Sequence, residues 1–450
     1  TLGMVCLVLV VRAWMGLGAP LTRWQQQIPI ISILALLLLR FAGMSRVCRE
    51  EQAPYCAPSF YAYQATTKFA DNPAYALSGP ATNSPYALAA AYLFAFAMAD
   101  ILRRILKPSH AHLSSASTLL TWIIRPALLG SSGFWLADWV HGLEQLDEAT
   151  RSTFLVIKIW TARAVLFLLV AGAWYWYLSP LSLSVLREPT QKRDAPPKVA
   201  LLGFGNTFGA AFLLFTSLAF SLLFLLSQPM GQLALSACFL AMVLIAELGD
   251  SERDARLLAA SKMPNAKDLS ASPSHAPSLL EIVCIGLLGF VAFFSTGHQA
   301  TFTAIQWRVA FVGFPVVTYP WSPLFVVLNA FGPLSILPAF GVVLLTLWNV
   351  APTRAKVQQE ETGHVRPMRL PGDILRSALG LLLYVGVLTW SAALWAWFFR
   401  RHLMLFKIWV PRYMMAGLGL LITDVALLGA VAVAWWIAAR TAKAFGTLYT

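Results

Sequence analysis

The run VALLGFGNTFGAAFLLFTSLAFSLLFLL, residues 199 to 226, contains no charged side chain and is long enough to cross a lipid bilayer. Similar apolar runs recur along the whole chain of 450 residues, of which 58% are hydrophobic and only 12% are charged. A soluble domain carries about twice that share of charged residues, so this chain lacks the polar side chains to cover a water-exposed surface. The sequence therefore predicts an all-α polytopic membrane protein, a bundle of transmembrane helices joined by short loops.

About eleven apolar runs are long enough to form transmembrane helices. They cover residues 2–18, 28–45, 86–106, 117–137, 153–178, 199–226, 232–248, 278–296, 321–349, 374–399 and 411–441. The range 321–349 contains three prolines, Pro323, Pro333 and Pro338. Because proline removes a backbone donor and clashes with the preceding turn, this range is predicted to be kinked or broken.

The connections between these runs alternate in charge. One set is rich in Lys and Arg, which favours the cytosolic side of a membrane. It comprises RRILKPSH (103–110), LREPTQKRDAPPK (186–198), residues 249–277 and residues 351–369. The basic loop 400–412 is an exception that falls on the opposite side. These loops account for the net charge of +13, so the charge does not predict nucleic-acid binding.

Two loops have further features. Residues 249–277, rich in Ser, Ala, Pro and charge, are predicted to form a disordered cytosolic linker. Residues 46–85 are predicted to form a loop on the non-cytosolic side, and Cys48 and Cys56 lie within it. An oxidising lumen favours a disulfide between these cysteines over the alternative of two free thiols.

Ionisable side chains within the predicted helices are costly to place in lipid and so are candidates for a specific role. Those of most interest are Asp100, Arg125, Lys158 and Arg163, and the others are Arg40, Glu247 and Asp424. Asp100 and Arg103 are three residues apart, so they are predicted to pair on one helix face. Lys158 and Arg163 have no acidic neighbour, so they either pair with another helix or face a polar cavity that receives a substrate.

The sequence contains no catalytic centre that a motif identifies. GxxxxGK[ST], HExxH and GxSxG are absent from the loops. The seven histidines are scattered, and the pair His110 and His112 has no carboxylate beside it. We interpret that pair as part of a solvated loop, and we predict no metal site and no catalytic residue in this chain.

The stretch FFSTGHQATFTAIQW, residues 293 to 307, places many hydrogen-bonding side chains between two apolar runs. Glycine beside His298 predicts a sharp turn at Gly297. An interfacial belt of Trp, Gln and His is one interpretation of the stretch. A kinked element that lines a groove for a lipid headgroup is the other, and the residues alone do not decide between them.

Four segments resemble the glycosylphosphatidylinositol (GPI) ethanolamine phosphate transferases, most closely those that act on the third mannose. The most specific is FFSTGHQATFTAIQWRVAFVGF, residues 293 to 314. The other three are SRVCREEQAPYC (45–56), TWIIRPALLGSSGFWLADW (121–139) and RRHLMLFKIWVPRYM (400–414). The resemblance extends over the whole chain.

The resemblance implies an enzyme of the endoplasmic reticulum membrane that moves phosphoethanolamine from phosphatidylethanolamine to a GPI precursor. It also implies a luminal catalytic domain like alkaline phosphatase, with bound zinc and a Thr nucleophile, and a small multi-span partner subunit of the PIG-F type. No segment here matches that catalytic domain. Because the chain starts at Thr1 inside an apolar run, we expect it to be part of a longer protein and to be inactive alone.

With this resemblance, the groove becomes the preferred interpretation of residues 293–320, which we expect to lie in the lumen. We expect the lipid headgroups to be contacted by His298, Gln299, Gln306 and Trp307, with Arg308 as a counter-charge. The membrane portion would hold both lipid substrates in place beneath the catalytic domain. Two other functions remain open, a lipid transporter or scramblase and a non-catalytic assembly scaffold.

Overall fold

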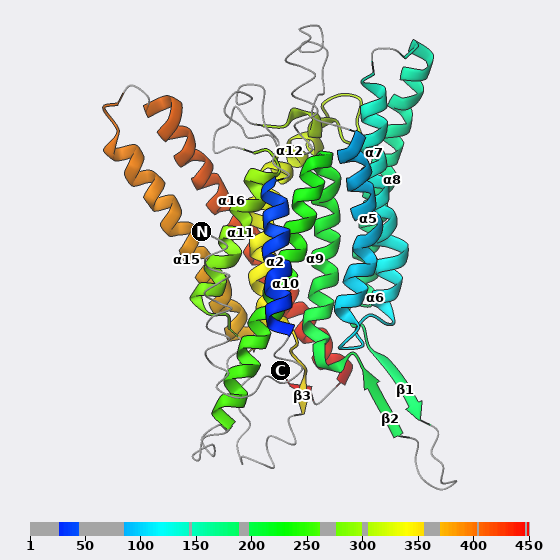
Figure 1. Ribbon diagram of the computed structural model, residues 1–450, viewed down its shortest axis with the longest axis vertical. Helices are drawn as coiled ribbons and strands as arrows, with labels where there is room; N and C mark the ends of the chain where they lie inside the picture. Colours follow the sequence, from blue (N-terminus) through cyan, green and yellow to red (C-terminus); the bar gives the residue numbers. More distant parts are fainter. Residues whose placement is uncertain are drawn as a thin grey trace.

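The computed structural model describes residues 27–44, 85–143, 146–188, 198–261, 276–298, 305–354, 370–402, 405–445 and 448–449. Within these ranges almost all regular structure is helical. The long helices run up and down one axis of an elongated bundle (Figure 1). The predicted all-α polytopic bundle is therefore confirmed for the described part of the chain.

Three elements form the buried centre of the bundle. They are α9 (Thr207–Leu226), α10 (Pro229–Ser261) and the broken helix formed by α12 (Trp321–Phe331), η7 (Gly332–Ile336) and α13 (Leu337–Leu347). In the most apolar stretch of each, 83% to 94% of the residues are buried. These helices are apolar all round, as expected of helices that contact other helices on every side.

The outer elements pack on two sides of this centre (Figure 1). On one side lie α5 (Pro85–Leu106), α6 (Ser115–Thr118), η2 (Leu119–Ile124), α7 (Arg125–His141) and α8 (Glu148–Leu178). On the other lie α11 (Leu279–Ser295), α15 (Leu370–Phe398), η8 (Leu405–Trp409) and α16 (Val410–Phe445). The helix α2 (Gln27–Met44) lies in front of α10 and also contacts α11. Only 17% of the apolar stretch of α15 and 28% of that of α16 are buried, so these helices present long apolar faces outward.

The prolines of the predicted range 321–349 break the helix as expected. α12 passes into a π-helical turn at Gly332–Ile336 that contains Pro333, and Pro338 lies in the first turn of α13. Pro333 and Pro338 have no amide hydrogen to donate, so the hydrogen-bond ladder of the helix is interrupted at this turn. The close packing of α11 against the break requires Gly289, where a Cβ atom would collide with Pro338.

The described connections gather at two ends of the bundle, as their alternation predicts. The upper end, at the top of Figure 1, carries the connection between α7 and α8, that between α9 and α10, and residues 305–320. The lower end carries residues 107–114, the end of α10, and an antiparallel hairpin of β1 (Ser184–Glu188) and β2 (Lys198–Leu202). A second short pair joins β3 (Thr353–Arg354) to β4 (Leu448–Tyr449) at the C-terminal end of the chain.

Three sequence predictions need correction or qualification. The helix predicted from residue 199 starts later, because residues 198–202 pair in the hairpin as β2. The linker predicted for 249–277 is wrong over its first part, since α10 continues to Ser261. The count of eleven spans is not confirmed: among described residues seven helices are long and apolar enough to cross a membrane and two apolar ones are shorter. Residues 2–18, Cys48 and Cys56 lie outside the described residues.

Candidate functional site

At the upper end, α11 finishes in a tight turn that carries His298. The amide of Gly297 donates to the Phe294 carbonyl, and the amide of His298 donates to the Phe293 carbonyl, both at 3.2 Å. Gly297 has a φ of 86°, a left-handed conformation that glycine adopts without a steric penalty. These features form a Schellman motif, in which a left-handed residue ends the helix and redirects the chain. The turn predicted at Gly297 is confirmed.

The imidazole of His298 is buried, with 4% of the residue exposed, and its orientation is fixed on both edges. Its Nε2 lies 2.9 Å from Oδ1 of Asn329, and its Nδ1 lies 3.0 Å from Oγ1 of Thr296. Asn329 donates its amide nitrogen to the Leu226 carbonyl, so its oxygen faces the ring and accepts from Nε2–H. The ring of Phe293 stacks on the imidazole at a centroid distance of 5.3 Å.

The C-terminal end of α9 explains why Asn329 is held firmly. The last four carbonyls of a helix have no partner within the helix. Here each accepts a side-chain donor at 2.8–2.9 Å: Ser227 Oγ on Leu223, Gln232 Nε2 on Phe224, Trp135 Nε1 on Leu225 and Asn329 Nδ2 on Leu226. The network therefore connects His298 to α7, α9, α10 and α12, which makes the upper end a rigid frame around the ring.

Among the other predicted headgroup contacts, Gln306 joins the turn that carries His298, because its Nε2 donates to the Thr296 carbonyl at 2.8 Å. Trp307 is 66% exposed and Arg308 is also exposed, both on the short helix η6 (Trp307–Phe311). Gln299 lies outside the described residues. The structure thus brings together His298 and Gln306 and leaves Trp307 and Arg308 at the surface.

A cavity of about 750 Å³ opens beside His298. Its walls come from α11, the break at η7 and α13, and the facing sides of α15 and α16. Most lining side chains are apolar or aromatic, such as Phe290, Phe293, Leu388 and Met415. His298 and Gly297 lie at the upper end of the cavity.

The polar groups of the cavity wall are unevenly distributed. Its three aliphatic hydroxyls are used by backbone carbonyls: Ser335 and Thr423 donate to Gly419, and Thr389 donates to Val385 and Ala416. Arg412, in the first turn of α16, is the one charged residue among the described residues that line the cavity, and it is exposed. A long apolar compartment with a cation at one end has the chemical character of a site for an acyl chain attached to an anionic headgroup.

Comparison with known proteins gives a consistent family. No family model matches the sequence, and no solved structure matches it. The chain is 28% identical over 398 residues to GPI ethanolamine phosphate transferase 3 of Eremothecium gossypii, which covers 88% of this chain and 34% of the relative. It is 27% identical over 411 residues to the Saccharomyces cerevisiae protein of the same name, 90% of this chain and 35% of that relative.

The chain is a homologue of the GPI ethanolamine phosphate transferase 3 proteins. The match to the human protein of that name, described as its catalytic subunit, extends over 285 residues at 28% identity and covers 57% of this chain and 25% of the relative. The chain spans about a third of the length of the two fungal relatives. The resemblance stated from the sequence is therefore confirmed, while the activity of the longer relatives passes to this chain only as a proposal.

The intramembrane charged residues of this transferase homologue lie away from the cavity, where they contact other groups of the bundle. Asp100 lies 2.5 Å from Arg125 and 3.4 Å from Arg103, so the predicted pairing of Asp100 with Arg103 is confirmed. Lys158 pairs with Asp138 on α7 at 2.9 Å. Arg163 donates to the Gly313 carbonyl at 2.9 Å. None of Asp100, Arg125, Lys158 and Arg163 lines the cavity, so their contacts fit pairing within the bundle.

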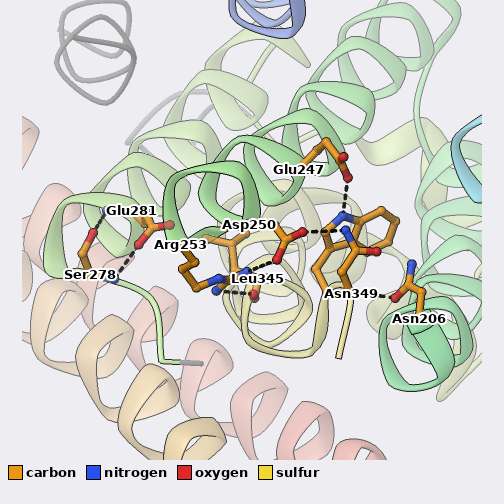
Figure 2. A network of polar contacts seen from close by, with 9 residues as sticks. Asn206, Glu247, Asp250, Arg253, Ser278, Glu281, Leu345 and Asn349 are labelled. Carbon is orange, nitrogen blue, oxygen red and sulfur yellow. Dashed lines mark hydrogen bonds and ion pairs between the residues drawn. The ribbon is translucent and has the colours of Figure 1, made fainter. Parts of the chain in front are cut away.

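A second polar network closes the lower end (Figure 2). Asp250 accepts from Nδ2 of Asn349 at 2.7 Å and lies 3.5 Å from Arg253, which also donates to the Leu345 carbonyl at 3.1 Å. Glu247 accepts from the indole of Trp348 at 2.6 Å. These contacts join α10 to the end of α13 and explain why α10 remains helical beyond the predicted span.

Sequence reasoning missed Asn329, Arg412 and the lower network. Asn329 lies in an apolar run and becomes significant only when it meets His298 across 31 positions of sequence. Arg412 belongs to residues 400–414, which resemble the transferases, and this resemblance could have marked it as a candidate site residue. Asp250 and Arg253 lie in the residues assigned to a linker, where their pairing at a spacing of three was a local signal for a helix.

Proposed function

We propose that this chain forms the membrane portion of an enzyme of the endoplasmic reticulum that transfers phosphoethanolamine from phosphatidylethanolamine to the third mannose of a GPI-anchor precursor. The homology to GPI ethanolamine phosphate transferase 3 proteins supports the reaction class. The cavity beside His298 supports the part that this chain plays in it. That part is to hold a lipid substrate in place.

The single observation that carries the proposal is the cavity of about 750 Å³ with an apolar interior and a polar upper end. An acyl chain fits between α11 and α15, because the hydroxyls there are already bonded to backbone carbonyls and leave an apolar surface. The phosphate of the lipid then lies near the cationic side chain of Arg412, close to the start of α16. His298 forms the adjacent wall in a fixed orientation.

In this proposal the upper end faces the lumen, and the catalytic domain with its zinc and Thr nucleophile is supplied by sequence outside this chain. Holding the substrate at a defined position and depth removes translational freedom before reaction, which can supply a large part of a rate enhancement. The bundle therefore acts by positioning, and this chain alone is inactive. A small multi-span partner subunit of the PIG-F type completes the proposed assembly.

Filling the cavity tests the proposal directly. Ala416 lines the cavity on α16, whereas Ala432 on the same helix is exposed on the outer face. In the full-length enzyme, Ala416→Trp should lower transfer of phosphoethanolamine to the third mannose at least about tenfold, because the indole occupies the space of the lipid. Ala432→Trp adds the same side chain outside the cavity and should leave transfer within about twofold.

Protein level and thermal unfolding are measured for both variants. Equal transfer by the two variants at equal protein level would show that the cavity is not needed for the reaction. Transfer of phosphoethanolamine by the isolated 450-residue chain would contradict the proposed division of labour.

A further inference from the structure

Asp424 is a carboxylate in the middle of a membrane-spanning helix. α16 begins at Val410, so Asp424 lies about 21 Å along the helix axis, well inside a bilayer. Its Oδ1 is buried and has no hydrogen-bond partner among the described residues. Other carboxylates in the described helices are engaged, for example Asp100 with Arg125, Asp138 with Lys158, and Glu247 with Trp348.

The carboxylate faces a groove on the outer side of the hairpin of α15 and α16. This groove has a volume of about 410 Å³ and is lined by Asp424 and Leu420 of α16 and by apolar residues of α15, among them Val387 and Trp390. No residue lines both this groove and the cavity beside His298, so the two are separate sites. Gly386 has no side chain to fill the groove, and no atom lies within 4 Å of its Cβ position.

A groove of this kind fits a helix. Small residues let two transmembrane helices approach closely, and a polar side chain in such a contact bonds across the interface. An ionisable group left in lipid costs at least a few kcal/mol, so a partner for Asp424 stabilises the assembled state. The intramembrane cations Arg125, Lys158 and Arg163 of the described residues already have partners elsewhere.

We propose that this groove binds a transmembrane helix of a different polypeptide, which presents a lysine or arginine to Asp424. A second copy of this chain, related by a two-fold axis along the membrane normal, would bring another Asp424 to the same depth, and two like charges near each other in lipid repel. A basic partner helix satisfies the carboxylate and covers the apolar groove in one contact. The inference rests on Asp424 and the groove and does not depend on the proposed transferase function.

Site-specific photo-crosslinking in native membranes tests the inference. The full-length protein carries p-benzoylphenylalanine in place of Val387 in the groove, or in place of Phe167, which is 76% exposed on α8, as the matched control. We expect Val387 to yield an adduct with a membrane-spanning peptide of another polypeptide that contains Lys or Arg. The control at Phe167 should give no adduct with that peptide.

The dependence on Asp424 separates this inference from simple proximity. Asp424→Asn keeps the shape and should lower the yield of the adduct at least about fivefold, while Asp424→Glu should retain most of it. Asp424→Leu, which removes the buried carboxyl and so spares the fold, should give the same loss as Asp424→Asn. Asp424→Lys should abolish the adduct, and Asp in place of the partner's basic residue should restore it.

Three outcomes would overturn the inference. One is an adduct with lipid alone, as at an ordinary lipid-facing position. Another is an adduct with this same sequence, either from a second copy or from residues 2–18, which contain Arg12. The third is a protein adduct whose yield is unchanged in both Asp424→Asn and Asp424→Leu.

Discussion

The two ends of the bundle are closed by polar networks of opposite character. At the lower end, charged groups bind one another and their neighbours, with Asp250 between Arg253 and Asn349. At the upper end the groups around His298 are the neutral side chains of Asn329 and Thr296, and a cavity opens beside them. Both networks join helices, and the upper network also holds the ring of His298 at the wall of a cavity.

The two networks differ because they bond different groups of the backbone and side chains. The lower contacts fix the end of α13 against α10. Arg253 donates to the Leu345 carbonyl, and Glu247 accepts from the indole of Trp348. The upper contacts cap the end of α9 and then extend through Asn329 to His298. We therefore expect changes at the lower end to alter stability and changes at the upper end to alter transfer.

The largest effect is expected for His298→Ala in the full-length enzyme. Loss of the ring leaves Oδ1 of Asn329 without its donor and removes part of the cavity wall, and misplacement of a bound substrate by about 1 Å can cost a hundredfold in rate. Transfer to the third mannose should fall by about that factor at normal protein level. If transfer stays within about twofold of the wild-type rate, His298 does not contribute to substrate positioning.

At the opposite end, Asp250→Ala should reduce stability and spare transfer. It removes the carboxylate that both Arg253 and Asn349 contact, and hydrogen bonds to charged groups contribute about 1.5–3 kcal/mol each. The midpoint of thermal unfolding in detergent should fall, with normal transfer per folded molecule. Glu148→Ala is the control, because Glu148 is 89% exposed in its pair with Arg151 and should change little. Loss of transfer at an unchanged midpoint would break the contrast between the two ends.

A smaller effect is expected to distinguish Arg412 from Arg308, two of the arginines at the upper end. Arg412 lines the cavity, whereas Arg308 does not. Arg412→Gln should raise the KM for phosphatidylethanolamine about fivefold, which is about 1 kcal/mol, without a change in thermal unfolding. Arg308→Gln should leave the KM unchanged. A raised KM in Arg308→Gln together with an unchanged KM in Arg412→Gln would instead support Arg308 as the counter-charge, as the sequence predicted.

The smallest expected effect is a dependence on pH at the lower end. Burial, followed by the charges of His110 and Lys107, lowers the pKa of His112 below its usual value. Because the folded pKa lies below the unfolded one, the neutral ring favours folding above about pH 6.5, and this stability declines as the pH falls toward the folded pKa. The midpoint of thermal unfolding should drop slightly more between about pH 7.5 and about pH 5.5 in the wild type than in His112→Gln. An identical drop in both proteins would contradict this assignment.

Local patterns predicted the parts of the molecule that depend on neighbouring residues. Apolar runs located the helices from 28–45 onward, prolines located the break between α12 and α13, and Gly297 located the turn. The pairing of Asp100 with Arg103 was also predicted, because residues three apart share a helix face. Each of these features is decided within a few residues of sequence.

Features that depend on distant contacts were not predicted. The partner of Lys158 is Asp138, which the sequence placed in a loop but the structure places in the last turns of α7. The cavity arises where α11, α13, α15 and α16 meet, and no single segment indicates it. The continuation of α10 depends on contacts of Asp250 and Arg253 with the end of α13, which override the loop-like composition after residue 249.

The central claim, that the cavity beside His298 holds a lipid substrate, is tested most directly by photolabelling the full-length enzyme in membranes with a photoactivatable phosphatidylethanolamine. The account predicts adducts on the peptides that line the cavity from α11, α15 and α16, with loss of these adducts in Ala416→Trp and retention in Ala432→Trp. Labelling confined to the outer faces of the helices, or equal labelling of the cavity peptides in the two variants, would contradict it.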